Sequence, residues 1–147
     1  MGDDLASAFA ATDAAFASIE RPEKFTDHPY CDECAGADEY FRNFTPLTFA
    51  DVTDQPETLP LSFLTDQAFV YLLPGTLRWL PRTGRQYRVG DMLFHVENRL
   101  HTLNPQQRAA LRDLLYIVCV RLKSHIETTA FDYPTIWRIL NELDLSQ

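Results

Sequence analysis

The stretch that decides the fold is LNPQQRAALRDLLYIVCVRLKSHI, residues 103–126. It begins with Asn104, a residue type favoured at helix N-caps. Pro105 follows at the first helical position, and Gln107 lies three residues after the cap, so the pattern predicts that a helix begins at Pro105. Apolar residues then recur at helical spacing, at Leu111, Leu115, Val118, Leu122 and Ile126. We therefore expect a long helix whose apolar face lies in a hydrophobic core.

Helical spacing of apolar residues predicts further helices along the chain. The expected segments are residues 5–19, 29–44, 65–80, 89–100 and 134–143. Thr65 is a suitable N-cap for the third segment, whereas Pro74 and Gly75 are expected to break or kink it. Gly36 is expected to weaken the second segment, because glycine is a poor helix former.

No segment of the chain convincingly predicts a β-strand. Amphipathic helices without a sheet must bury their apolar faces against one another. The length of 147 residues is ordinary for a single domain. We therefore expect an all-α fold, a compact bundle of about five to seven helices that forms one domain over residues 1–147.

The charge of the chain is unevenly distributed. Residues 1–66 contain 14 acidic and three basic residues, a net charge of −11, whereas residues 67–147 contain seven acidic and ten basic residues, a net charge of +3. An acidic surface repels the phosphate backbone, so nucleic-acid binding is not expected. The acidic N-terminal half is one of the two regions that we expect to meet a protein partner.

Targeting signals are not evident in the sequence. No run of about 18 apolar residues predicts a membrane span. The first residues, Met1 to Asp4, are acidic where a secretory signal would be basic. The three cysteines are too few and too unevenly spaced for a secreted disulfide framework. We therefore expect a cytoplasmic protein.

A basic and aromatic segment is the candidate interaction surface. Its residues are Arg78, Trp79, Arg82 and Arg85. Tryptophan and arginine are enriched at the energetic centres of protein interfaces. The arginines would meet an acidic partner or the acidic half of this chain. A second tryptophan, Trp137, lies beside Arg138; core packing is the alternative for both tryptophans.

The cysteine motif His28-x-x-Cys31-x-x-Cys34 has the spacing of metal ligands. Two thiolates and one imidazole at this spacing can reach one zinc ion. A structural zinc site needs four ligands, and the sequence offers only distant residues for the fourth: Cys119, His95, His101 or His125. Zinc is therefore the one cofactor that the sequence suggests.

Two other roles remain open for Cys31 and Cys34. They are reduced structural cysteines or a thiol-redox pair. The neighbouring Asp32 and Glu33 disfavour a thiolate and weaken the redox interpretation. Cys119, within an apolar run, is expected to be a core residue.

Several motifs resemble those of an uncharacterised family of small bacterial proteins, a domain of unknown function. They are the segments Arg21–Thr26 (RPEKFT) and Cys31–Ala35 (CDECA), followed by the pair Asp38-Glu39. Members of that family carry R-P-E-x-F-T and then C-x-E-C-A-E-H-D-E. Two less specific segments, Phe69–Pro74 (FVYLLP) and Leu103–Ala110 (LNPQQRAA), are also similar to the family, so the resemblance extends over roughly residues 20–120. This chain has Ala37 where the family commonly has histidine, which weakens the zinc hypothesis. The resemblance implies an architecture more than an activity.

Sequence motifs of common enzyme classes are missing from the chain. It has no G-x-S-x-G, phosphate-binding loop, dinucleotide fingerprint or H-E-x-x-H. The first hypothesis is therefore a non-catalytic protein that acts through a protein partner or as a homodimer. The second is a zinc-binding protein, and an enzyme with a site assembled from distant residues is a third.

Overall fold

The computed structural model describes residues 2–27, 32–53, 55–82, 89–121 and 133–145. Within these ranges the chain forms α-helices and short 3₁₀ turns, with one isolated β-bridge between Thr26 and Leu64. The α-helices are α1 (Gly2–Phe16), α2 (Asp32–Phe41), α3 (Pro46–Phe49), α4 (Asp66–Leu77), α5 (Gly90–Glu97), α6 (Pro105–Arg121) and α8 (Tyr133–Leu145). The 3₁₀ turns are η1 (Pro56–Thr58), η2 (Leu61–Phe63), η3 (Leu80–Arg82) and η4 (Leu100–Thr102). The predicted all-α fold is confirmed.

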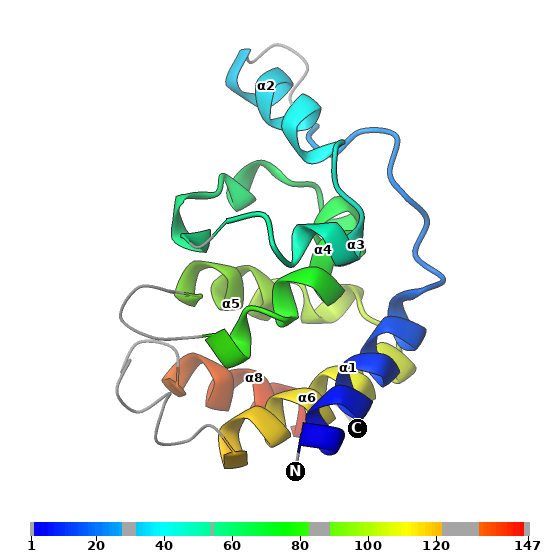
Figure 1. The fold of residues 1–147 in the computed structure, drawn as a ribbon, viewed down its shortest axis with the longest axis vertical. Helices are drawn as coiled ribbons and strands as arrows, with labels where there is room; N and C mark the ends of the chain where they lie inside the picture. Colours follow the sequence, from blue (N-terminus) through cyan, green and yellow to red (C-terminus); the bar gives the residue numbers. More distant parts are fainter. Residues whose placement is uncertain (1, 28–31, 54, 83–88, 122–132, 146–147) are drawn as a thin grey trace.

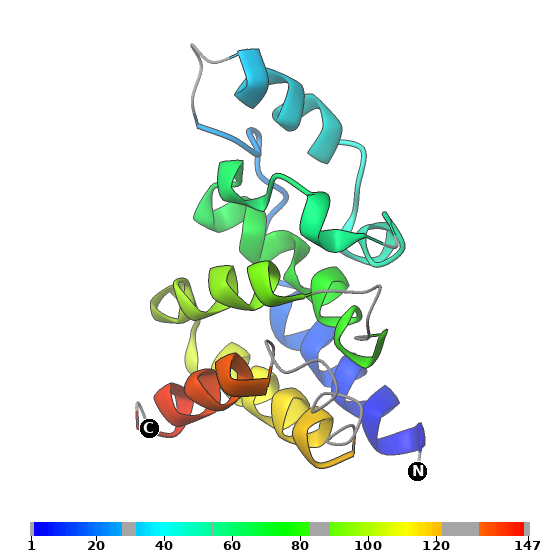
Figure 2. The ribbon, with the colours of Figure 1, turned by 90° about the vertical axis from the view of Figure 1, so that its left-hand side faces the viewer.

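The helices are stacked along the long axis of the molecule (Figures 1 and 2). Helices α1, α6 and α8 lie at the end that holds both termini, and α2 lies at the opposite end. Helix α6 packs against both α1 and α8, and α8 also contacts α5. Helix α4 contacts α1 and α3, so it links the two ends.

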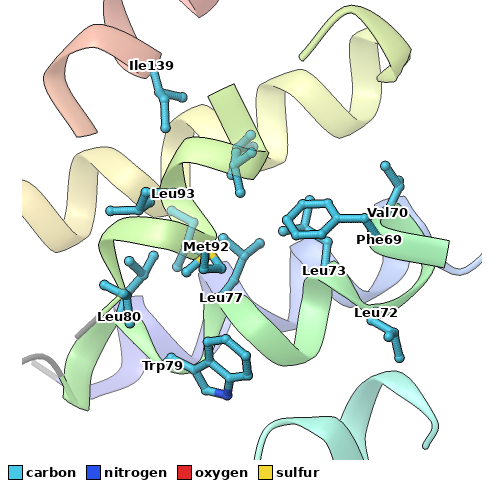
Figure 3. Close-up of a cluster of buried hydrophobic side chains, with 14 of the residues drawn as sticks. Phe69, Val70, Leu72, Leu73, Leu77, Trp79, Leu80, Met92, Leu93 and Ile139 are labelled. Atoms are coloured by element: carbon cyan, nitrogen blue, oxygen red, sulfur yellow. The ribbon is translucent and has the colours of Figure 1, made fainter. Parts of the chain in front are cut away.

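The core runs through α4, α5, α6 and α8 (Figure 3). Amphipathic helices place their apolar faces there, and burial of each large aliphatic side chain contributes about 1.5–3 kcal/mol. Figure 3 shows side chains of α4 beside Met92 and Leu93 of α5 and Ile139 of α8. The predicted inward residues of the last helix are all buried: Ile136, Ile139, Leu140 and Leu143.

The start of α6 matches the sequence prediction. The backbone N–H of Gln107 donates to Asn104 Oδ1 (2.8 Å), and the backbone N–H of Asn104 donates to Gln107 Oε1 (3.0 Å). This reciprocal pair is a capping box. Gln107 also donates to the Ala15 carbonyl and so links α6 to α1. Leu111, Leu115 and Val118 are buried, while Leu122 and Ile126 lie outside the described residues.

Helix α4 differs from the sequence prediction at Pro74 and Gly75. Thr65 caps it as expected, because its hydroxyl accepts the Ala68 N–H at 3.1 Å. Pro74 and Gly75 were expected to break or kink the helix, but α4 continues through both to Leu77. Almost every residue of α4 from Ala68 onward is buried. This burial outweighs the cost of a proline inside the helix, which is about 3 kcal/mol.

Helix α2 is held by residues of the RPEKFT segment. Asp38 accepts the backbone N–H groups of Phe25 (2.5 Å) and Thr26 (3.2 Å) and also pairs with Arg42 (2.6 Å). Partial burial raises the pKa of Asp38, but these donors outweigh it and lower the pKa below 3.8. Gly36 does not interrupt α2. The polar contacts of Asp38 and Arg42 with this segment thus fasten α2 to the rest of the chain.

Candidate functional site

The predicted interaction surface around Trp79 is an internal contact. Trp79 is fully buried, and its indole N–H donates to the Ala50 carbonyl at 3.0 Å. Its ring also packs against Phe49 of α3. The placement of Trp79 on an interaction surface is therefore wrong, because the residue closes the junction between α3 and the end of α4.

The neighbouring arginines are paired within the chain. Arg78 forms a bidentate salt bridge with Asp13 of α1, at 2.9 and 2.7 Å. Arg82 pairs with Asp51 at 2.9 Å and donates to the Ala50 carbonyl at 2.7 Å. Both arginines therefore meet the acidic half of this chain, one of the two alternatives that the sequence left open. Arg85 lies outside the described residues.

The zinc hypothesis stays a prediction. His28 and Cys31 lie outside the described residues, and of Cys34 only the backbone, within α2, is described. Among the described residues, no three His, Cys, Asp or Glu side chains form a group that could hold a metal ion. Cys119, the first of the candidates for the fourth ligand, is buried in α6, and α6 lies at the opposite end of the molecule from α2 (Figure 1).

His95 and Cys119 have structural surroundings. The buried His95 ring has Nδ1 3.1 Å from the Arg99 guanidinium and Nε2 3.7 Å from Asp91. Burial lowers the pKa of His95 and Arg99 lowers it further, against the opposing effect of Asp91. Burial raises the pKa of the Cys119 thiol to about 11, so this cysteine is a core residue as predicted.

A groove with an apolar lining lies between α6 and α8. Its volume is about 510 Å³. Tyr116 and Ile117 of α6 face Trp137 and Leu140 of α8 across it. Leu140 is buried, whereas Tyr116 is 58% exposed and Trp137 is 40% exposed. The groove thus presents two large, partly exposed aromatic side chains beside the buried Leu140 and the partly buried Ile117.

One end of this groove is charged. Arg112, Asp113 and Asp144 line it. Arg112 lies 3.5 Å from Asp113, which is a long salt bridge. Since α6 and α8 pack side by side, this charged end and the aromatic part belong to one surface. We call the seven lining residues the α6–α8 groove.

A second groove lies beside α2. Its volume is about 370 Å³, and its lining residues are Lys24, Thr26, Asp27, Ala35, Asp38, Arg42 and Thr65. Asp38 and Arg42 are bonded to each other and to the chain around them. These polar groups fasten α2, so this groove is a weaker candidate than the α6–α8 groove.

The sequence predicts part of the α6–α8 groove. It indicates Trp137 as a candidate interface residue but does not indicate Tyr116. The signal for Tyr116 was available: it and Val120 lie one turn apart in α6, off the predicted core face, where a solvated helix usually carries polar residues. Only the packing of α6 on α8 brings Tyr116 to Trp137.

No helix within the described ranges has the length and apolar character needed to cross a bilayer. Comparisons of the chain with protein-family models, with curated proteins and with solved structures gave no match.

Proposed function

We propose that this chain is a non-catalytic, cytoplasmic domain that binds a partner protein through the α6–α8 groove. The observation that carries the proposal is the pair of exposed aromatic residues, Tyr116 and Trp137, beside Ile117 and Leu140. Tyrosine and tryptophan are enriched among the residues that dominate binding energy at interfaces. Their rings offer a large apolar contact area at a low cost in side-chain entropy.

The chemistry of the groove favours binding over catalysis. Its described lining contains one tyrosine, one tryptophan, one arginine and two aspartates, with two aliphatic residues. Of the groups that commonly act as bases or nucleophiles, the lining holds the carboxylates of Asp113 and Asp144 and the phenol of Tyr116, but no histidine, cysteine or lysine. Burial of each exposed aromatic surface against a partner would contribute about 1–2 kcal/mol.

The proposal is tested by capture with matched variants of the full-length protein. Wild type, Trp137→Ala and Leu47→Ala are immobilised and exposed to a native cell lysate. The proteins that bind to each are identified by mass spectrometry. Leu47 is a suitable control, because it is 60% exposed on α3, outside the groove. Circular dichroism confirms that each variant is folded.

We expect a partner that wild type and Leu47→Ala retain equally and that Trp137→Ala retains at least about tenfold less. A partner profile that is the same for all three proteins would overturn the proposal. Light scattering after gel filtration reports the homodimer separately. A dimer that Trp137→Ala dissociates would assign the groove to a second copy of this chain.

A further inference from the structure

We infer that the partner segment is an amphipathic helix that carries a basic residue about two turns from its apolar anchor. This inference rests on the proposed function, because it names the chemistry of the segment that the α6–α8 groove accepts. It is carried by the charge at one end of the groove, by the position of Asp144 in α8 and by the spacing along α8.

The charged end of the groove has an excess of negative charge. Two carboxylates, Asp113 and Asp144, lie there with one guanidinium, Arg112. The guanidinium is adjacent to Asp113, so the charge of Asp144 is the excess. Residues 67–147, which contain the groove, have a net charge of +3, so the attraction of a basic partner is local to Asp144.

Asp144 is poorly placed for the stability of its own helix. It lies in the last turn of α8, which has no basic residue. The C-terminal end of a helix carries partial negative charge, so a carboxylate there is unfavourable by about 0.3–1 kcal/mol. Glu142 lies in the same turn, and of these two acidic residues only Asp144 lines the groove, where a basic ligand would offset this cost.

The spacing along α8 sets the pattern of the partner. Trp137 and Asp144 are seven residues apart in one helix, which corresponds to about 10 Å along its axis. A partner helix aligned with α8 matches both residues when its apolar anchor and its Lys or Arg are about seven positions apart. The anchor then packs between Tyr116 and Trp137 while the cation meets Asp144.

The experiment measures the affinity of the full-length protein for three fluorescent synthetic helical peptides by anisotropy. The first has a leucine face with lysines seven positions from its central leucine, and the second has glutamate in place of each lysine. The third has the lysines moved to the opposite face of the helix. The protein variants are Trp137→Ala, Asp144→Asn and Glu142→Gln. Glu142→Gln is a matched control, since it removes an equal charge from the same helix turn without lining the groove.

We expect the first peptide to bind at least about tenfold more tightly than the other two, and more weakly as salt rises. Trp137→Ala should weaken this binding about 30-fold, and Asp144→Asn about two- to fivefold. Glu142→Gln should change the affinity by less than about twofold. This set of results would support the inference.

Other outcomes overturn the inference in distinguishable ways. If the lysine and glutamate peptides bind equally and both lose affinity in Trp137→Ala, the basic partner is wrong but the groove still docks a protein. If the lysine peptide binds Trp137→Ala as tightly as it binds wild type, the peptide is held by nonspecific charge attraction and not by the groove, and the inference fails. If no peptide binds while the capture experiment still finds a Trp137-dependent partner, only the inference fails. If the capture experiment also fails, the proposed function fails with it.

Discussion

Replacement of Gly75 by alanine should destabilise the protein, although alanine is the better helix former. A Cβ at Gly75 would lie 2.0 Å from the carbonyl oxygen of Pro46 and 3.2 Å from the backbone nitrogen of Ala50. Both atoms belong to the backbone of the α3 turn, so no flexible side chain can move away. Ordinary contact requires at least 3.4 Å. The α3 turn must therefore shift by more than about 1 Å relative to α4.

The size of the effect follows from the contacts that such a shift disturbs. Trp79 and Arg82 both donate to the Ala50 carbonyl, and Phe49 of the same turn is fully buried. Overpacking costs about 1–3 kcal/mol. Loss of the two hydrogen bonds costs about 0.5–1.5 kcal/mol each, and the helix-propensity gain returns about 1 kcal/mol. We expect a net loss of about 1–5 kcal/mol with a centre near about 3 kcal/mol, or a Tm lower by about 6–12 °C at that centre.

The assay is urea and thermal unfolding followed by circular dichroism, with Gly36→Ala as the matched control. Gly36 also lies within a helix, but a Cβ there meets nothing within 4 Å. Gly36→Ala should leave stability unchanged or raise it by up to about 1 kcal/mol. The reasoning is refuted if Gly75→Ala is as stable as wild type, or if both variants shift stability in the same direction.

Three further predictions concern titration, thiol reactivity and metal content. The pKa of His95 is lowered from 6.5 in the folded protein, so the unfolded chain binds a proton more readily at this residue. The resulting contribution to stability is complete above about pH 6.5 and is lost as the pH falls below it. The unfolding free energy should therefore fall from about pH 7.5 to 5.5, less steeply in His95→Asn; equal slopes would contradict this. In a Cys31→Ser/Cys34→Ser background, the buried Cys119 thiol should react with a disulfide reagent at about pH 8 only after unfolding; fast reaction of the native protein would argue against its burial. If the His28, Cys31 and Cys34 motif holds zinc, protein purified without chelator contains about one zinc per chain, and the double serine variant contains none. Reactive Cys31 and Cys34 thiols and no zinc in the native protein would reject that site.

The candidate site was partly predictable, and the two tryptophans of the chain show where the limit lies. Both Trp79 and Trp137 lie next to an arginine in the sequence, so sequence reasoning treated them alike. In the structure Trp79 is sealed by Ala50 and Phe49, whereas Trp137 remains 40% exposed. Exposure depends on which segments pack over a side chain, and local sequence does not contain that information.

Local patterns in the sequence determined where several helices begin and which faces they bury. The capping box at Asn104 and the cap at Thr65 are hydrogen bonds between residues three positions apart, so they can form without the rest of the fold. The buried positions of α6 and α8 follow in the same way from the 3.6-residue helix period.

Tertiary structure alone decided the features that depend on distant segments. Helix α4 continues through Pro74 because burial on several sides outweighs the local penalty. Arg78 meets Asp13, 65 residues away, and Tyr116 lines the same groove as Trp137 only because α6 packs on α8. These contacts depend on how the helices are arranged in three dimensions. The free energy that stabilises this arrangement comes from packing across the whole core, so no single segment of the sequence determines it.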